Sequence, residues 1–207
     1  REPAREARTY LRLLAEVTDA PDAWDRLSHL YAEAREPERL LAVLALRLEA
    51  ARTPEGRAQR LLHLALAALV VARDPDRAEG FLRRWVSESN EPERVVHRAA
   101  AALVRWGAPA RAVDFLRAYA AEAAPAPSAS LMEHAVHIAE THLGDPRGAL
   151  DLAREGLDRA PGSPALLVAF ERAALMTADV QAAIDTYATL RDKALGEEQL
   201  LEAIRAQ

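Results

Sequence analysis

The strongest constraint on the fold of this 207-residue sequence is a proline-marked segment that returns at nearly constant intervals. In each copy a small or acidic residue, followed by a proline or in the last copy a valine, precedes an apolar stretch. The marker residues are Pro3, Pro37, Pro75, Pro109, Pro146 and Val180. Subtracting successive positions gives intervals of 34, 38, 34, 37 and 34 residues, which indicates one structural unit used repeatedly.

The chemistry of this marker is that of a helix start. Proline at the first helical position loses no hydrogen bond within the helix, and an acidic residue before it accepts from free backbone amides. A second proline series falls between the members of the first, at Pro21, Pro54, Pro92, Pro127 and Pro164. The two proline series therefore predict two helices in each repeat. Gly107 and Gly144 supply the positive φ that commonly ends a helix, so we expect tight turns and antiparallel neighbours.

Composition also favours helices. Hydrophobic residues make up 50% of the chain and aromatic residues only 5%, and the chain is rich in alanine, leucine and arginine, which are good helix formers. A single helical hairpin leaves apolar faces open, and neighbouring hairpins bury them by stacking. We therefore predict an all-α fold of stacked antiparallel hairpins.

The predicted second helix of several hairpins carries small and bulky residues at positions i, i+4 and i+7. They are Ala112, Leu116 and Tyr119, then Ala149, Ala153 and Gly156, then Ala183, Tyr187 and Leu190. In the first helix of the first complete hairpin, Trp24, Leu27 and Tyr31 occupy the bulky positions. With these residues the chain resembles divergent tetratricopeptide (TPR-like) repeats. The resemblance implies a right-handed α-α superhelix, or solenoid, whose first helices line a concave groove.

The intervals of 37 and 38 residues exceed the 34 residues usual for that family. Longer turns, or a related helical-hairpin repeat, are both open interpretations. We predict a single domain, 1–207, with about five complete hairpins at 21–52, 54–88, 91–122, 128–160 and 163–195. Partial helices at 1–18 and 196–207 flank them. Because the sequence opens with Arg1 rather than methionine, we expect a piece of a longer chain.

The sequence disfavours catalysis and several classes of partner. It contains no glycine-rich phosphate loop, no serine elbow, no cysteine and no histidine pair with zinc-protease spacing, so we expect no enzyme and no cofactor. A net charge of −5 gives no positive field for a phosphate backbone, so we expect no nucleic-acid partner. The longest apolar run, 61–72, is short of the roughly 20 residues of a membrane span. The compartment stays open, with the cytoplasm favoured.

Polar residues on the predicted first helices are the candidates for contact with a partner. They are Arg26, His29, Arg94, His97, Arg98, Arg105, Glu133, His137 and Glu140. An ordinary solvated helix face has the same pattern. His134, His137 and Glu140 carry donor atoms that a divalent metal accepts, but a polar stripe accounts for them without an ion, and we predict no metal site.

Two predicted first helices, 61–72 and 166–176, carry few polar residues on any side. Such helices are normally buried, and the alternative is an apolar groove floor that receives a partner's helix or peptide. We expect burial, and we expect Trp24, Trp85 and Trp106 in the core or at hairpin junctions.

The predicted function is that of a protein–protein interaction scaffold, which binds a peptide or helix in the concave groove. An accessory or regulatory domain of a larger enzyme or signalling protein is the alternative. An RNA-binding helical repeat would need a basic groove, which the acidic total disfavours. The oligomeric state is left open.

Overall fold

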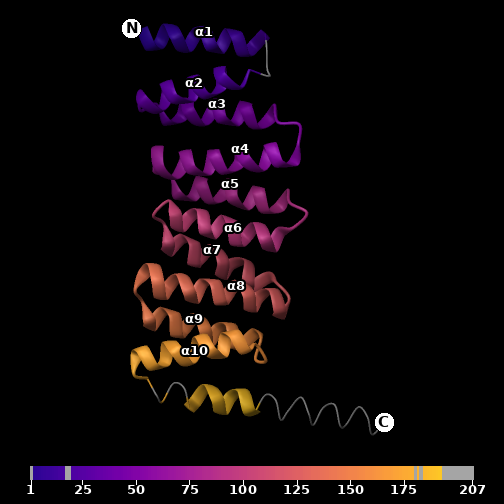
Figure 1. Cartoon of the computed structure of the whole chain (residues 1–207), viewed down its shortest axis with the longest axis vertical. Helices are drawn as coiled ribbons and strands as arrows, with labels where there is room; N and C mark the ends of the chain where they lie inside the picture. The colour runs from indigo at the N-terminus through magenta and orange to yellow at the C-terminus, as the bar shows by residue number, and fades with distance from the viewer. Residues whose placement is uncertain (1, 17–19, 180, 182–183, 193–207) are drawn as a thin grey trace, which may run out of the picture. The chain divides into compact units, whose positions relative to one another are not determined.

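The computed structural model describes residues 2–16, 20–179, 181 and 184–192. All regular structure among these residues is helical, with no strand (Figure 1). The elements are α1 (Glu2–Glu16), α2 (Pro21–Glu33), α3 (Pro37–Glu49), α4 (Pro54–Leu66), η1 (Ala67–Val71), α5 (Pro75–Ser87), α6 (Pro92–Arg105), α7 (Pro109–Glu122), α8 (Pro125–Ile138), η2 (Ala139–Leu143), α9 (Pro146–Arg159) and α10 (Pro164–Thr177). Residues 184–192 are also helical.

The helices form two compact units, 1–95 and 96–207, and the boundary falls inside α6. In unit 1, each helix from α1 to α5 packs against the next one. In unit 2, each helix from α7 to α10 packs against the next one, and α10 also contacts α8. The predicted all-α fold of helices stacked in chain order is therefore confirmed. We call α2, α4, α6, α8 and α10 the first helices, and α3, α5, α7 and α9 the second helices.

The start of each helix follows the proline rule that the sequence suggests. Every helix from α2 to α10 begins at a proline. One predicted start is wrong: α8 begins at Pro125 rather than at Pro127 or Ser128. Because the first turn of a helix has no partner for its amides, Pro127 fits there without loss, and the Ser128 amide donates to the Ala124 carbonyl at 2.9 Å.

The long repeat intervals arise from longer first helices. The helical segments formed by α4 with η1 and by α8 with η2 contain 18 and 19 residues (13 + 5 and 14 + 5), whereas α2 and α10 contain 13 and 14. Both long segments end in a π-helical turn. The 37- and 38-residue intervals therefore hold about one extra helical turn, and longer connecting turns are not the cause.

Each first helix ends with one residue in the left-handed conformation. These residues are Arg35, Arg73, Gly107, Gly144 and Ala178, with φ between 54° and 80°. After each of them the next backbone amide donates to a carbonyl of the last turn, at 2.9–3.2 Å. Glycine is the residue most often found in this helix-ending geometry. The sequence predicts it at Gly107 and Gly144, but three other residues adopt it without glycine's freedom.

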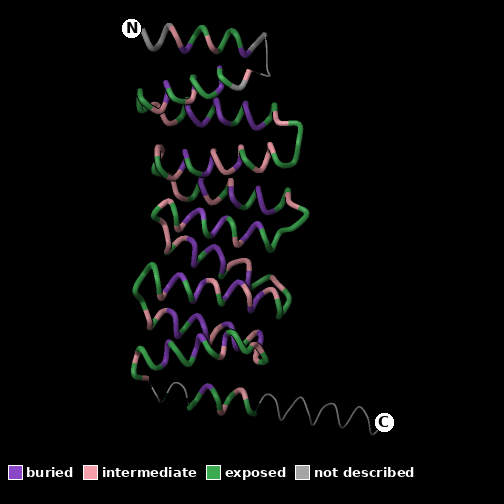
Figure 2. Tube along the Cα trace, in the orientation of Figure 1, coloured by how far each residue is buried: buried purple, intermediate pink, exposed green. Residues whose placement is uncertain are grey.

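The core runs as stripes along the helix sides that face their neighbours within each unit (Figure 2). Trp24 and Trp85 are buried as predicted, and Trp106 is partly buried. Gly156 of α9 lies at a close approach, since a Cβ there would be 3.0 Å from Cβ of Met132 and 2.9 Å from Leu166. Small residues in the second helices thus set how closely neighbouring helices pack.

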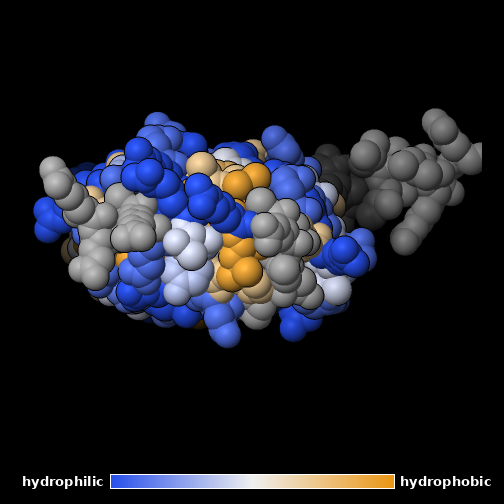
Figure 3. Space-filling view, turned by 90° about the horizontal axis from the view of Figure 1, so that it is seen from above, coloured by the Kyte–Doolittle hydropathy of each residue, from blue (hydrophilic) through white to orange (hydrophobic). Residues whose placement is uncertain are grey.

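The prediction that the two apolar first helices are buried is only partly right. Leu61, Leu64 and three alanines of α4 and η1 are buried, but Leu66 is open to solvent and Val70 is 54% exposed. In α10, Phe170 is buried while Leu175 is 80% exposed. In the view of Figure 3, apolar side chains also lie open between hydrophilic ones. Among the described helices, none has the length and apolar character of a membrane-spanning segment.

Candidate functional site

Each first helix carries a basic side chain between buried residues. Each of these residues follows one buried residue by two positions and precedes another by one. They are Arg26, His63, Arg98, His134 and Arg172. Counted back from the left-handed residue that ends each helix, the first four lie nine or ten positions away, whereas Arg172 lies six positions away and belongs to a later position of the repeat. The partners of these residues differ between the two units.

In unit 2, His134 of α8 meets His97 of α6. Their Nδ1 atoms are 2.9 Å apart, and His97 Nε2 lies 3.2 Å from Oγ of Ser130. The centroids of the two rings are 5.1 Å apart. The 2.9 Å between the Nδ1 atoms makes up most of this distance, so the two nitrogen atoms face one another. One ring must donate its proton and the other must accept it with a lone pair, so at least one ring is neutral.

Burial lowers the pKa of His134, and the neighbouring His97 and His137 lower it further. The pair therefore favours low charge and links two successive first helices through a hydrogen bond. The order Ser130, His97, His134 also matches that of a nucleophile, a base and an orienting residue. Acyl transfer needs donors for the developing oxyanion as well, and the amides around Ser130 belong to the hydrogen-bond ladder of α8. The arrangement favours a structural link over acyl transfer.

The predicted groove residue Glu140 lies in η2 and pairs with Arg172 of α10. Arg172 Nε donates to Oε1 at 3.0 Å and Nη2 donates to Oε2 at 2.7 Å, while the Glu140 side chain is only 8% exposed. The hydrogen bond and charge of Glu140 raise the pKa of Arg172. Glu140 and His134 therefore bond to neighbouring helices instead of to a shared ion. In the described part of the chain, no three histidine, cysteine or acidic residues gather as metal ligands would.

In unit 1, Arg26 of α2 donates to Glu6 of α1 at 2.8 Å, which raises the Arg26 pKa. Its neighbour Asp25 accepts from Nη1 of Arg47, an arginine of α3 that is almost fully buried. Two partly buried residues of α4, Arg60 and His63, lie near this pair. Burial lowers the pKa of both, and the charge of Arg47 lowers both further. The sequence prediction missed Arg47 and Arg60.

The other predicted groove residues are mostly exposed. His29 lies 3.4 Å from Glu33 on its own helix, and Arg94 pairs with Glu91 at 2.9 Å. The remaining exposed candidates are Arg98, Arg105, Glu133 and His137. Exposure leaves all of them accessible to a partner, and partner binding at these residues remains a prediction.

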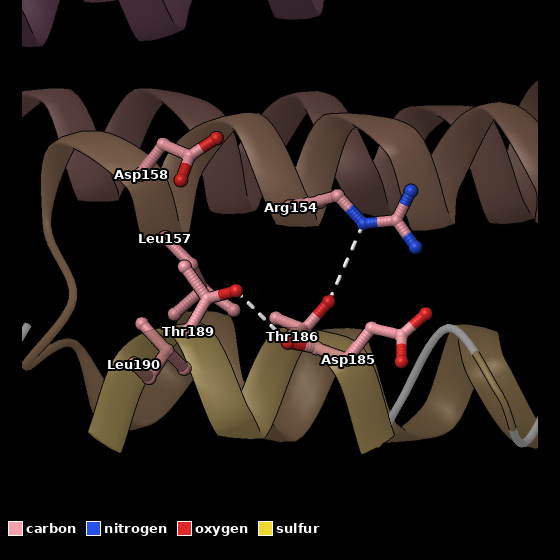
Figure 4. A pocket seen from close by; sticks show the side chains of 7 residues that line it. All are labelled: Arg154, Leu157, Asp158, Asp185, Thr186, Thr189 and Leu190. Carbon is pink, nitrogen blue, oxygen red and sulfur yellow. Dashed lines mark hydrogen bonds between the residues drawn. The ribbon is translucent and has the colours of Figure 1, made fainter. Parts of the chain in front are cut away.

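The second helices are linked by ion pairs across one repeat. Arg77 of α5 pairs with Glu38 of α3 at 3.0 Å, and Arg117 of α7 pairs with Glu155 of α9 at 2.7 Å. A shallow pocket of about 340 Å³ lies between α9 and helix 184–192 (Figure 4). Its lining residues are Arg154, Leu157, Asp158, Asp185, Thr186, Thr189 and Leu190. Arg154 reaches Oγ1 of Thr186 at 3.4 Å across this pocket, so its polar groups serve the contact between the helices.

One signal in the sequence locates the links between repeats. Polar partners in unit 2 are separated by about one repeat, with 37 residues between His97 and His134 and 32 between Glu140 and Arg172. Complementary residues at that spacing on equivalent helices are therefore candidates for direct contact. Asp25 and Arg60 are also about one repeat apart, at 35 residues, but Arg47 on the helix between them has no such spacing from either.

The solved structures to which this chain is similar have low sequence identity to it. No family model matches the chain, and no characterised protein matches its sequence. BtubC (BKLC) from P. vanneervenii is similar over 95% of this chain and 90% of that chain, at 12% identity and a TM-score of 0.39. A Podosopora anserina protein, described as a kinesin light chain with nearly identical TPR-like repeats, is similar over 86% and 96%, at 16% identity and a TM-score of 0.39. The fold assignment rests on the order and contacts of the helices themselves.

Proposed function

We propose that this chain is a TPR-like protein-interaction scaffold that binds a peptide or a helix of a partner protein on its first helices. The observation that carries the proposal is the apolar surface these helices leave open. Leu66 and Val70 are exposed in unit 1, as are Val168 and Leu175 in unit 2. Leu66 and Val70 are four positions apart and form an apolar edge on one side of their helix, whereas the charged Glu171 and Arg172 lie between Val168 and Leu175.

Exposed polar residues on other first helices support the same function. They include Arg105 of α6 and His137 of α8. Binding sites for peptides combine apolar contact area with a few polar groups that fix the orientation of the ligand. The predicted groove residues fit the second role, and the exposed apolar residues fit the first.

Selection of random peptides displayed on phage tests this proposal. Enriched peptides are synthesised, and their Kd is measured by fluorescence anisotropy on the native chain and on two double variants, Leu66→Ser with Val70→Ser and Val168→Ser with Leu175→Ser. At least one double variant should weaken binding about tenfold, since a few buried apolar contacts dominate such interfaces.

The matched control is Leu46→Ser, which removes an apolar residue of a second helix, α3, that is 57% exposed. Binding that is lost in this control but retained in both first-helix variants would place the surface elsewhere. Failure to enrich any peptide would count against a peptide-binding scaffold.

A further inference from the structure

In unit 1, two arginines and a histidine share a single carboxylate. We call this group the Arg47 cluster, and it consists of Asp25, Arg47, Arg60 and His63. Arg47 is 7% exposed, and its Nη1 donates to Asp25 at 2.5 Å. Its Nε is buried and lacks a hydrogen-bond partner among the described residues. A buried donor left unpaired destabilises the fold, so Arg47 holds its positive charge inside the fold with Asp25 as its hydrogen-bond acceptor among the described residues.

The two members on α4 also lack partners. Arg60 and His63 are partly buried, and neither forms a hydrogen bond or ion pair within the part of the chain that the structure describes. Asp25 is the acidic group that raises the pKa of both, and its effect is smaller than the effects of burial and of Arg47. One carboxylate therefore faces two guanidinium groups and an imidazole.

An apolar edge continues from the cluster along the same helix. Leu66 and Val70 follow His63 by three and seven positions, which places all three on one side of α4 and η1. Seven residues of helix span about 10 Å, which is the length of about three residues of extended peptide. A charged contact and an apolar contact are thus available at a defined separation.

We propose that the Arg47 cluster binds a carboxylate side chain of an acidic peptide segment, while an apolar side chain about three residues away in that peptide contacts Leu66 and Val70. The inference rests on the proposed function, because it takes a first helix as the binding surface. The carboxylate accepts hydrogen bonds from Arg60 and His63 and supplies the second negative charge that the cluster lacks.

The chemistry of the site favours a peptide over a nucleic acid. Phosphate groups also suit arginine, but a nucleic acid offers little for the aliphatic edge at Leu66 and Val70. The net charge of −5 opposes a long polyanion more than a short peptide with one acidic residue. An acidic peptide can offer the cluster one carboxylate and an apolar side chain beside it, so it fits this site better than a nucleic acid does.

The test uses fluorescein-labelled glycine–serine peptides that carry one glutamate and one leucine three residues apart. Matched peptides replace the glutamate with glutamine or the leucine with serine. We expect the Glu–Leu peptide to bind the full chain and each matched peptide to bind about tenfold more weakly, because charge-assisted hydrogen bonds and apolar burial each contribute on this scale. Fluorescence anisotropy measures all three affinities.

Protein variants complete the test. Arg60→Gln and His63→Gln should each weaken binding of the Glu–Leu peptide about tenfold. Arg39→Gln serves as the control, because Arg39 is exposed on α3 and pairs with Glu36 at 2.7 Å. In NMR titrations of the native chain, the Glu–Leu peptide should raise the pKa of His63, whereas the glutamine peptide should leave it unchanged.

Several results would overturn the proposal. They are a Glu–Leu peptide that fails to bind, equal binding of the glutamate and glutamine peptides, unchanged binding to Arg60→Gln, and displacement of the peptide by single-stranded RNA. If peptides selected on phage bind the first helices but none depends on Arg60, the inference fails while the proposed function stands. If selection also yields no peptide, both fail.

Discussion

Helix α4 of unit 1 and helices α8 and α10 of unit 2 are all first helices, but their basic residues have different partners. In unit 2, His134 bonds to His97 and Arg172 bonds to Glu140, so each of these residues links a first helix to the previous first helix. In unit 1, His63 and its neighbour Arg60 form no such link to a described residue. Buried small residues and prolines set the hairpin, and polar positions are then free to serve either stability or binding.

The largest difference in stability between the units is expected when one glycine is replaced in a second helix of each unit. Gly156→Val in unit 2 should destabilise the fold by about 3 kcal/mol, because its side chain would collide with Met132 and Leu166. Gly80→Ala on α5 in unit 1 meets no atom within 4 Å and should stabilise the fold by about 1 kcal/mol through helix propensity. Urea unfolding of both variants measures the difference, and equal effects would contradict the assigned packing.

The next comparison removes one charged side chain from each unit. Glu140→Gln should destabilise unit 2 by about 2 kcal/mol, because it leaves Arg172 without its bidentate carboxylate. Arg60→Gln should leave unit 1 equally stable or slightly more stable, because it removes a partly buried cation that has no described partner.

Native-state hydrogen exchange, followed by mass spectrometry of peptides from each unit, separates these two effects. A destabilising Arg60→Gln would mean that Arg60 holds the fold together and would argue against a binding role.

A smaller effect is expected at the ends of two first helices. Arg73→Gly in unit 1 should raise stability and Gly107→Ala in unit 2 should lower it, each by about 1 kcal/mol, because both positions hold positive φ. A Cβ at Gly107 would meet no atom within 4 Å, so backbone strain alone should set its cost. The melting temperatures of the two variants should shift in opposite directions. Shifts of the same sign would rule out this explanation.

The smallest effect is a dependence on pH in unit 2. The His134 pKa is lowered in the fold, so the unfolded chain binds more protons at acid pH, and stability should fall as the pH drops below about 6.5. Protonation of both His97 and His134 would also break their hydrogen bond. Hydrogen exchange of unit 2 at pH 7 and pH 5 measures this loss, which His134→Gln should reduce. An unchanged acid response in that variant would assign it to other groups.

Local signals in the sequence were sufficient for much of the fold. Proline at the first helical position predicted nearly every helix start, and the predicted burial of the aromatic side chains of Trp24 and Trp85 is confirmed. The predicted start of α8 was wrong because two prolines, Pro125 and Pro127, fit the same first turn. The extra turn of the long first helices was also missed, because interval length alone does not distinguish a longer helix from a longer loop.

The candidate site was less predictable, because its contacts depend on how successive helices are placed. Glu140 was predicted as a groove residue, yet its position against α10 makes it a link within unit 2. The Arg47 cluster joins residues of three helices, and only the packing of α2, α3 and α4 reveals that they meet. Left-handed conformations at Arg35, Arg73 and Ala178 carry no glycine signal, so only the fold identifies them.

The prolines that open every helix from α2 to α10 also affect how this chain can recognise anions. A helix start normally presents free amides to a phosphate or carboxylate, but here a pyrrolidine ring replaces one of them. At four of these starts the side chain of Thr53, Asp74, Asp145 or Ser163 accepts a hydrogen bond from another amide. The proposed recognition of a carboxylate therefore depends on arginine and histidine side chains instead of backbone amides, and these side chains can vary from repeat to repeat while the helix starts stay the same.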